Sequence, residues 1–466
     1  MPPKGAAMRA RAQGTLAGLH HERLTAPELV GLVADLRGQV LEDDAAVNVR
    51  EIGRSQDRAL KIPKELVVEL SQTESLSHEA WIEARQQAEF TLFQPWLEKI
   101  LKLKKEVAER VGYEGTIYNA LLDEYEPYAR TEDIEPVFAE LKEKLVPLVE
   151  KITATEKFPA KGIIDQDFAI AKQEELGRQV LADLGFDLEA GRLDVAVHPF
   201  CAGTSRDDVR LTTRYSADWL PGSLFGTIHE AGHGLYEQGL PANAVGTPAG
   251  GSVSLGIHES QSRLWENMVG RSRAFWTHYL PRLKALFPAQ LQEIDLDSFY
   301  AAVNQVEPSL IRVEADEVTY NLHILLRFEL ERDLLEERVE VAELPSVWNE
   351  RMQQYLGVRP PDDAQGVLQD VHWSFGLMGY FPTYTLGNLY GAQFFHQAQQ
   401  DLPDLQAQIG RGELLNLKTW LNDKVHSRGS RLMAGELVEE VTGEKLNADY
   451  FTDYLQKKFG ALYELD

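Results

Sequence analysis

The sequence predicts a mainly α-helical protein with one small β-sheet, and two patterns support this prediction. Amphipathic, charged segments with helical periodicity cover most of the 466 residues, whereas alternating apolar residues are confined to one short region. That region lies shortly before a helical segment that contains the pattern His-Glu-x-x-His. We therefore expect a helical body with the sheet beside its functional centre.

Several segments carry the helical pattern. The first starts with Thr25-Ala-Pro-Glu28, which fits a capping box with proline in the first turn. Acids and lysines on the outer faces predict solvated helix surfaces. From Leu310 to the end, the chain returns to helices. The expected helices before that point are residues 25–38, 77–110 (interrupted near Pro95), 132–152, 168–184 and a helix around His229 that ends at Gly239.

The strand signal is local. Apolar residues alternate with polar or small ones over residues 193–197 and again over residues 209–213, with a turn region at 203–207 between them. This pattern predicts a small antiparallel pair. Residues 250–256 are expected to add a third short strand.

Composition limits the class of protein. No stretch approaches the roughly 20 apolar residues of a membrane span, and the first residues lack the apolar segment of a signal peptide. The single cysteine, Cys201, excludes an intrachain disulfide and favours a reducing, cytoplasmic location. We interpret Cys201 as a small buried residue rather than a nucleophile. No linker divides the chain, so residues 1–466 are expected to form one domain.

The net charge of −26, from 73 acidic and 47 basic residues, argues against a nucleic-acid partner. Proteins that neutralise phosphates need clustered lysine and arginine side chains, and the sequence has no such block. The acidity indicates solubility and says nothing of the fold.

The histidine pair predicts a metal site. Residues four apart on a helix lie on one face, so His229 and His233 can reach the same ion, and zinc commonly uses such ligands. Glu230 lies where it can touch a water on the metal, so we interpret it as the catalytic base. The alternative is a buried helix whose histidines bond backbone carbonyls. Gly232 and Gly234 are poor helix formers, and they favour close packing around a site instead.

A catalytic zinc needs a third protein ligand and an open position. A second helix near residues 256–267 could present Glu259, while His258 and Glu266 compete for the same role. Spacing favours Glu259. Glu266, seven residues further on, is interpreted as an acceptor for a ligand histidine, with a plain surface carboxylate as the alternative.

These residues and four further motifs resemble the carboxypeptidase Taq family of metallocarboxypeptidases. The motifs occur in the family's order, and the tail with His426, Gly429 and residues 436–443 also looks like the family's C-terminal helices. The four further motifs are His198-Pro199-Phe200, Asp208-Val-Arg210-Leu-Thr212, Ile311-Arg312-Val-Glu-Ala-Asp316 and Gly366-Val-Leu-Gln369-Asp370-Val-His372-Trp373.

The resemblance implies a helical zincin-type fold with a deep central groove, two helical lobes and a homodimer. It also implies His229, His233 and Glu259 as zinc ligands and Glu230 as the catalytic residue, with cobalt or manganese as possible substitutes for zinc. The opening Met1-Pro-Pro-Lys resembles a segment that family members carry inside the chain. One or two N-terminal helices are therefore expected to be missing, which predicts an exposed apolar patch.

Two further roles follow from this resemblance. Release of the last residue requires recognition of a free carboxylate, which a guanidinium does best, and Arg312 is favoured over Arg210 for it. The alternative for either arginine is a salt bridge, for example with Asp208 or Asp316. A loose resemblance to zinc peptidases of the angiotensin-converting-enzyme kind suggests that His372 and Tyr384 stabilise the oxyanion. Tyr380 is the other candidate for the role of Tyr384. Alternatively, the aromatic residues of this segment belong to the core and have no catalytic role.

The predicted activity is a zinc-dependent carboxypeptidase of broad specificity that acts on peptides with a free C-terminus. An endo-acting oligopeptidase would use the same chemistry. A non-catalytic peptide-binding scaffold would require an incomplete set of ligands and base, which the sequence does not have.

Overall fold

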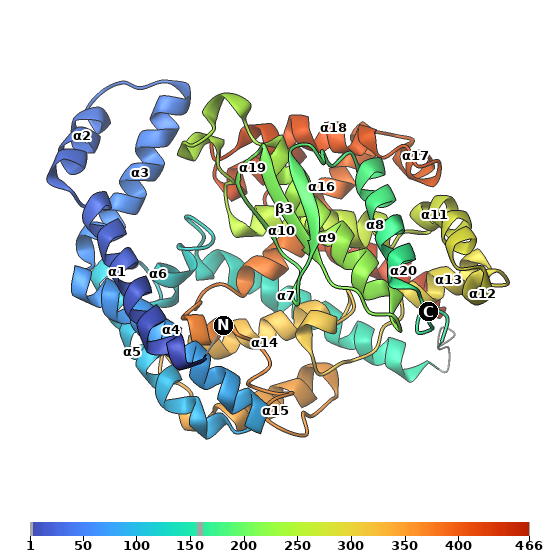
Figure 1. Ribbon diagram of the computed structural model, residues 1–466, viewed down its shortest axis with the longest axis horizontal. Helices are drawn as coiled ribbons and strands as arrows, with labels where there is room; N and C mark the ends of the chain where they lie inside the picture. Colours follow the sequence, from blue (N-terminus) through green and yellow to red (C-terminus); the bar gives the residue numbers. More distant parts are fainter. Residues whose placement is uncertain (1–2, 156–161, 466) are drawn as a thin grey trace. The chain divides into compact units, whose positions relative to one another are not determined.

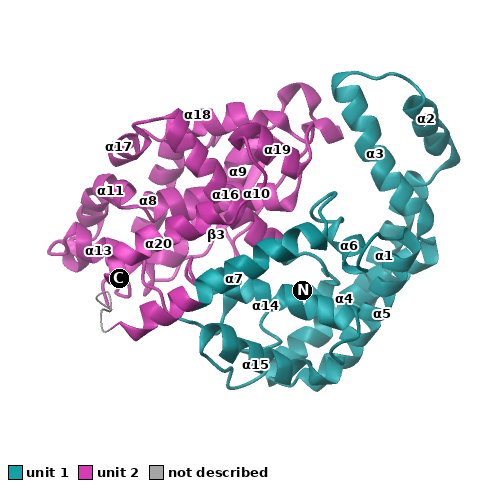
Figure 2. Ribbon diagram, turned by 180° about the vertical axis from the view of Figure 1, so that it is seen from behind, with its two compact units in different colours: residues 1–146, 308–315, 319–382 teal, residues 147–307, 316–318, 383–466 magenta. Residues whose placement is uncertain are grey.

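The computed structural model describes residues 3–155 and 162–465 and confirms the mainly helical class, with 68% of residues in helices. The chain divides into two compact units, shown in Figure 2. Unit 1 comprises residues 1–146, 308–315 and 319–382, and unit 2 comprises residues 147–307, 316–318 and 383–466. The single domain and the central groove stay predictions. No described helix is long and apolar enough to cross a membrane.

Unit 1 is built from helices. Proline in the first turn starts α5, so the interruption near Pro95 is a boundary between two helices. Leu97, Ile100, Leu101 and Val107 of α5 are buried at helical spacing and form part of the core. The helices are α1 (Ala6–Leu24), α2 (Pro27–Arg37), α3 (Asp43–Lys61), α4 (Lys64–Gln87), α5 (Gln94–Val111), α6 (Tyr118–Leu122), α14 (Tyr320–Leu335), α15 (Leu344–Leu356) and most of α7 (Thr131–Ala154).

The predicted capping box at Thr25 is wrong, although the helix that it introduces is present as α2. The Thr25 hydroxyl donates a hydrogen bond at 2.8 Å to the carbonyl of His21, one turn earlier in the chain. The residue before α2 is Ala26, whose side chain cannot cap. Thr25 therefore closes α1 instead of opening α2.

Helix α1 carries an exposed apolar stripe. Met8, Leu16 and Leu19 are 66%, 67% and 51% exposed, and their spacing places them on one face of the helix. The absence of N-terminal helices, from which we expected an apolar patch, stays a prediction. What covers the stripe stays a prediction.

Unit 2 combines the sheet with the remaining helices (Figure 1). Helix α9 packs against strand β3, and α8 and α10 pack against α9. The strands are β1 (Gly191–Val195), β2 (Cys201–Ser205) and β3 (Asp208–Thr213). The helices are α8 (Ile170–Leu184), α9 (Leu220–Gly239), α10 (Leu255–Arg263), the π-helix η5 (Leu264–Gly270), α11 (Arg273–Leu286), α12 (Pro288–Leu291), α13 (Leu296–Val303), α16 (Pro382–Asp401), α17 (Leu405–Gly410), α18 (Leu415–Lys424), α19 (Ala434–Thr442) and α20 (Asp449–Tyr463).

The small sheet is present, but its predicted topology is wrong in two respects. The strands order as β1-β3-β2, and β1 pairs with β3 in parallel, with Leu193 opposite Leu211. The antiparallel partner of β3 is β2, which occupies most of the segment that we predicted as a turn. The sequence of β2 includes small residues such as Ala202 and Gly203, so it lacks the alternation of apolar and polar residues from which we predicted strands. The sheet is therefore mixed rather than antiparallel.

The predicted third strand at residues 250–256 is also wrong. Residues Pro248–Gly250 form a 3-10 turn, and α10 begins at Leu255. Ser254 caps this helix, since its hydroxyl accepts a hydrogen bond from the Ile257 amide at 3.0 Å. The cap fixes where α10 starts, and so which residues its first turns present.

Glycine allows α9 and α10 to approach closely. A β-carbon on Gly232 would lie 2.5 Å from both the Gln261 carbonyl oxygen and the Ser262 α-carbon of α10. One on Gly234 would meet Phe186 at 2.7 Å, on the side of the sheet. The interpretation of these glycines as close-packing residues is confirmed, and they bring the His-Glu-x-x-His segment against α10.

Candidate metal centre

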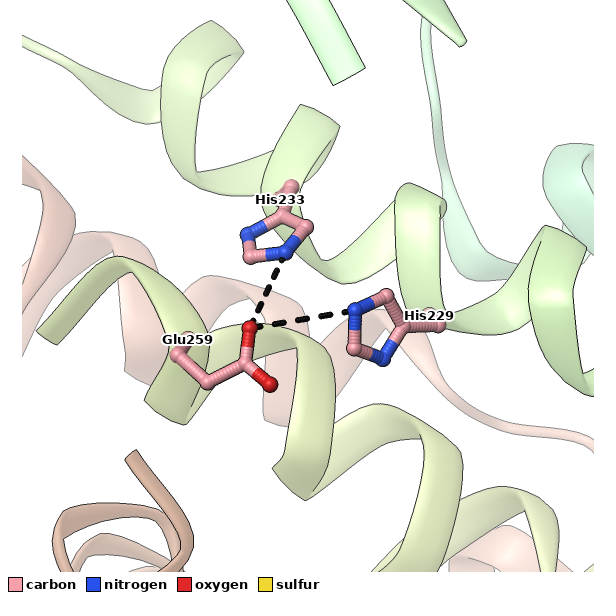
Figure 3. A group of neighbouring side chains, drawn as sticks. All are labelled: His229, His233 and Glu259. Atoms are coloured by element: carbon pink, nitrogen blue, oxygen red, sulfur yellow. Dashed lines mark ion pairs between the residues drawn. The ribbon is translucent and has the colours of Figure 1, made fainter. Parts of the chain in front are cut away.

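Two helices of unit 2 bring three candidate ligands together. Helix α9 begins with a proline in its first turn and ends at Gly239 as predicted, and it presents His229 and His233 one turn apart. Helix α10 presents Glu259. One ligand atom from each residue lies within 4.8 Å of the others, and Figure 3 shows both rings directed at the same carboxylate oxygen. Within the described residues, His229, His233 and Glu259 are the histidines and acids that lie close enough together to hold a metal ion.

The distances fit a divalent ion. Nε2 of His233 lies 3.3 Å and Nε2 of His229 lies 3.8 Å from Oε2 of Glu259. Two atoms that each bind a tetrahedral zinc ion at about 2.1 Å lie roughly 3.4 Å apart. Two imidazoles and one carboxylate are also a donor set that catalytic zinc sites use. The three residues therefore fit a zinc-like ion by both donor type and spacing.

The ring nitrogen of His229 that does not face Glu259 contacts a second carboxylate. Nδ1 of His229 lies 2.9 Å from Oε2 of Glu266, on the π-helix η5. Arg263 and Arg271 also donate hydrogen bonds to Glu266. The interpretation of Glu266 as an acceptor for a ligand histidine is confirmed as a contact, and its alternative as a plain surface carboxylate is wrong because the residue is buried.

The ring nitrogen of His233 that does not face Glu259 contacts another histidine. Nδ1 of His233 lies 2.6 Å from Nδ1 of His258, and Nε2 of His258 lies 2.8 Å from Oε1 of Glu237. His258 lies on the opposite side of His233 from Glu259. His258 is therefore not one of the three grouped side chains, and the alternative in which it is the third ligand is not supported.

Local charges hold Glu259 ionised. Nε of Arg263, one turn further along α10, donates a hydrogen bond at 2.6 Å to Oε1 of Glu259, which leaves Oε2 directed at the histidines. Burial alone would raise the pKa of Glu259, but Arg263 and the two histidines outweigh burial and depress it strongly. The carboxylate is thus charged and oriented.

Glu230 has the environment of a proton acceptor. Its side chain is buried, and burial raises its pKa to about 7, with a smaller opposing effect from His229. Burial also lowers the pKa of the neighbouring His233 to about 4, so that ring is neutral at pH 7. A carboxyl group with a pKa near neutrality can both take and return a proton at physiological pH.

Arg312 and His372 belong to a buried cluster in unit 1. Nε and Nη2 of Arg312 donate hydrogen bonds to Oδ1 of Asp370 at 2.9 and 2.8 Å, and Nε of Arg327 donates to Oδ2 at 2.6 Å. The ring of His372 packs against that of Phe381 at a tilt, with ring centroids 4.5 Å apart, and burial lowers the pKa of His372 to about 3. The alternative of a salt bridge for Arg312 is confirmed, with Asp370 as a partner.

The other predicted residues have different settings. Arg210 on β3 is exposed and donates two hydrogen bonds to Asp208, at 2.9 and 2.8 Å. This salt bridge is the alternative role that we predicted for Arg210. Tyr384 lies in the first turn of α16, one turn before Gly387, which packs against Glu259. Cys201, at the start of β2, is half-buried and not fully buried as predicted, and burial raises the pKa of its thiol, which argues against a nucleophile. Tyr380, the rival of Tyr384, belongs to unit 1, where its ring lies 5.3 Å from that of His372.

The sequence interpretation missed two features. Arg327 gave no motif, because an arginine inside an apolar helix is read as a surface residue until its burial is known. Glu237 did leave a signal, since it follows His233 by four residues and therefore lies on the same face of α9.

Comparisons with known proteins agree with this centre. The family model described as "Carboxypeptidase Taq (M32) metallopeptidase" matches residues 1–459. Thermostable carboxypeptidase 1 of Thermus thermophilus is 47% identical, with 99% of this chain and 93% of the relative covered. Carboxypeptidase 1 of Bacillus subtilis is 41% identical, with 100% and 93% covered.

Solved structures show the same likeness. The M32 carboxypeptidase from Deinococcus radiodurans matches with a TM-score of 0.95 and 41% identity, over 100% of this chain and 94% of that one. The carboxypeptidase of Pyrococcus furiosus matches with a TM-score of 0.94 and 41% identity, over 98% and 93%. The chain therefore belongs to the carboxypeptidase Taq (M32) family of metallopeptidases and is a metallocarboxypeptidase, a peptide hydrolase.

Proposed function

We propose that this carboxypeptidase releases C-terminal amino acids from peptides with broad specificity, using a zinc ion held by His229, His233 and Glu259. The observation that carries the proposal is the convergence of two Nε2 atoms and Oε2 of Glu259 beside the buried carboxyl group of Glu230. Cobalt or manganese would fit the same donor set.

Glu230 would act as the general base. When bound, the ion would polarise the scissile carbonyl and lower the pKa of a water molecule. Glu230 would accept a proton from the attacking water and deliver it to the amine that leaves when the C–N bond breaks. Its pKa of about 7 supports both transfers.

Arg312 would recognise the free carboxylate of the substrate. The buried guanidinium groups of Arg312 and Arg327 both donate hydrogen bonds to the carboxylate of Asp370, so Arg312 is held as a buried cation in unit 1. A buried positive charge attracts an incoming carboxylate strongly because little solvent screens it. Arg210 is the second candidate, and its exposed pair with Asp208 makes it the weaker one.

His372 and Tyr384 would donate hydrogen bonds to the developing oxyanion. The low pKa of His372 leaves its ring neutral at pH 7, so it would act through an N–H dipole and not through a full charge. Tyr384 lies on the helix that packs against Glu259. Tyr380 remains the alternative tyrosine.

The family resemblance supports two further proposals, a homodimer and a cytoplasmic location. The dimer is tested by light scattering of the purified protein, in which a mass near 52.5 kDa would contradict it.

The activity is tested with paired peptides that differ only in a free or amidated C-terminus. A carboxypeptidase cleaves the first and stalls on the second, whereas equal cleavage of both would indicate an endo-acting oligopeptidase. Glu230→Gln should retain the metal and lose most peptidase activity, and Glu439→Gln, at an exposed position of α19, is the matched control. A metal-loaded Glu230→Gln variant with full activity would exclude Glu230 as the base.

A further inference from the structure

The two candidate histidine ligands are supported in different ways. His229 contacts a carboxylate directly, at 2.9 Å from Glu266. His233 reaches a carboxylate only through the ring of His258, by contacts of 2.6 Å to His258 and 2.8 Å from His258 to Glu237. This row of His233, His258 and Glu237 is called the relay below.

A metal on His233 would fix every proton in the relay. Nε2 of His233 faces the other ligands, so it must be unprotonated, and the proton of the neutral ring must lie on Nδ1. Nδ1–H of His233 then donates to Nδ1 of His258, which must present a lone pair. The proton of His258 therefore lies on Nε2, from which it donates to Glu237.

The opposite arrangement excludes a metal. If His258 donated from Nδ1, then Nδ1 of His233 would have to accept, and the proton of His233 would occupy Nε2, which is the atom directed at Glu259. Carboxylate oxygens accept hydrogen bonds, so the contact of 2.8 Å between Oε1 of Glu237 and Nε2 of His258 favours the arrangement in which His258 carries its proton on Nε2. Glu237 thus biases His233 toward the form that can bind an ion.

The fold holds the relay in place. His233 and Glu237 lie one turn apart on α9, and His258 lies directly before Glu259 on α10. The ring of Tyr236 packs edge-on against that of His258, with centroids 5.2 Å apart. The side chains of His258 and Glu237 are 16% and 30% exposed, so the relay leads from the buried ligand to the edge of the site.

We propose that His258 and Glu237 are positioning residues that hold His233 in the metal-binding tautomer and make its Nε2 a better electron donor. The inference rests on the proposed metal site and extends it. Such outer partners raise the basicity of a ligand histidine, and their loss typically weakens metal binding or activity by about 10–100-fold.

The test compares two substitutions of His258 by the affinity of the protein for Zn²⁺, measured by competition with a chromogenic chelator. His258→Leu removes the acceptor for His233 and should weaken Zn²⁺ binding by about 10–100-fold. His258→Asn keeps an oxygen acceptor at a similar position, so it should bind Zn²⁺ more tightly than His258→Leu. His396→Leu, at an exposed position of α16, is the matched control and should bind as the wild type does.

A double-mutant cycle tests whether Glu237 acts through His258. Glu237→Gln alone should weaken Zn²⁺ binding, but in the His258→Leu background it should change the affinity by no more than about twofold. Additive effects, or wild-type affinity in His258→Leu, would overturn the relay. A wild-type protein that binds no divalent metal would instead overturn the proposed function, so the two failures are distinguishable.

Discussion

Gly387 lies so close to Glu259 that a β-carbon at position 387 would be 2.4 Å from Cγ of Glu259. Helix α16 therefore forms the wall behind the carboxylate of the metal centre, and a hydrogen atom is the largest side chain that this wall accepts. Gly391, one turn later, repeats the contact at the Ser260 carbonyl, where a β-carbon would lie at 2.9 Å. Two glycines thus fix the distance between α16 and α10.

Gly387→Ala should displace Glu259 and weaken metal binding. Because the contact involves the base of the Glu259 side chain, the carboxylate cannot keep its position without a shift of α10 or α16. We expect a loss of about 1–3 kcal/mol in the free energy of unfolding together with reduced Zn²⁺ affinity. Chemical unfolding and chelator competition measure the two effects.

The control for this substitution is Gly460→Ala in α20, where nothing lies within 4 Å of an added β-carbon. Alanine favours a helix over glycine by about 1 kcal/mol, so this variant should be at least as stable as the wild type. Equal Zn²⁺ affinity in Gly387→Ala and Gly460→Ala would contradict the role assigned to the contact.

Removal of the metal should lower thermal stability. An ion that binds only the folded chain stabilises it by about 2.7 kcal/mol when its free concentration is 100 times Kd. We expect chelation to lower the melting temperature of the wild type, as measured by calorimetry. Glu259→Gln, which removes the charged ligand, should respond much less. A wild-type melting temperature that chelation leaves unchanged would argue against a bound ion.

Asp370→Asn should destabilise unit 1 strongly. It would leave the buried guanidinium groups of Arg312 and Arg327 without their shared counter-charge. Breaking a buried ion pair by loss of one partner costs about 3–5 kcal/mol, which urea unfolding can measure. Asp208→Asn, in the exposed pair with Arg210, is the control and should shift the urea midpoint little.

Arg312→Ala should raise KM for peptides with a free C-terminus by about tenfold or more, since a hydrogen-bonded charge is lost. Zn²⁺ affinity should change much less, because Arg312 is not one of the three predicted ligands. Steady-state kinetics with chelator competition on the same variant separates the two effects. Unchanged kinetics would remove Arg312 from substrate recognition and favour Arg210.

His323→Leu should make the protein less sensitive to acid. Burial, with Arg327 and Arg312 nearby, holds the pKa of His323 well below its usual value near 6.5. Below pH 6.5, the unfolded chain therefore binds a proton that the folded chain does not, so stability that is complete above pH 6.5 is lost as the pH falls. The variant should lose about 1.4 kcal/mol less per pH unit in this range.

Urea unfolding at pH 7.5 and 5.5 measures this difference. A residual slope is expected in His323→Leu, because burial also lowers the pKa of His372 and of His426 to about 3. His396→Leu, which replaces an exposed histidine of α16, is the matched control. The same slope in His323→Leu and in the wild type would contradict the prediction.

The candidate ligands were predictable because their geometry is local. The spacing of His229 and His233 on one helix places both rings on one face, whatever the rest of the chain does. Glu259 lies on another helix, so spacing left it in competition with His258, and only the resemblance to a family decided between them. The structure distinguishes the two residues, because Glu259 faces Nε2 of His233 and His258 contacts Nδ1 of the same ring.

The sheet was harder to predict, because alternation reports which face of a strand is buried and not the direction of its partner. Leu193 and Leu211 lie opposite each other and fit a parallel and an antiparallel pair equally well. The small residues of β2 carry no pattern at all. Burial of Arg327 likewise depends on Asp370, 43 residues later in the chain, which no local pattern reports.

The π-helix η5 links the two carboxylates that contact His229. Glu259 lies on α10 and Glu266 lies seven residues later, after the chain has entered the wider turns of η5. A π-helical segment holds an extra residue relative to an α-helix, so deletion of one residue before Glu266 would let these turns close into an α-helix and change the direction in which Glu266 leaves it. Glu266 would then face away from His229 even though no side chain of the centre had been exchanged. The centre should therefore tolerate conservative replacements within residues 264–270 more readily than any change in their number, so that chain length in this segment is itself a determinant of the site.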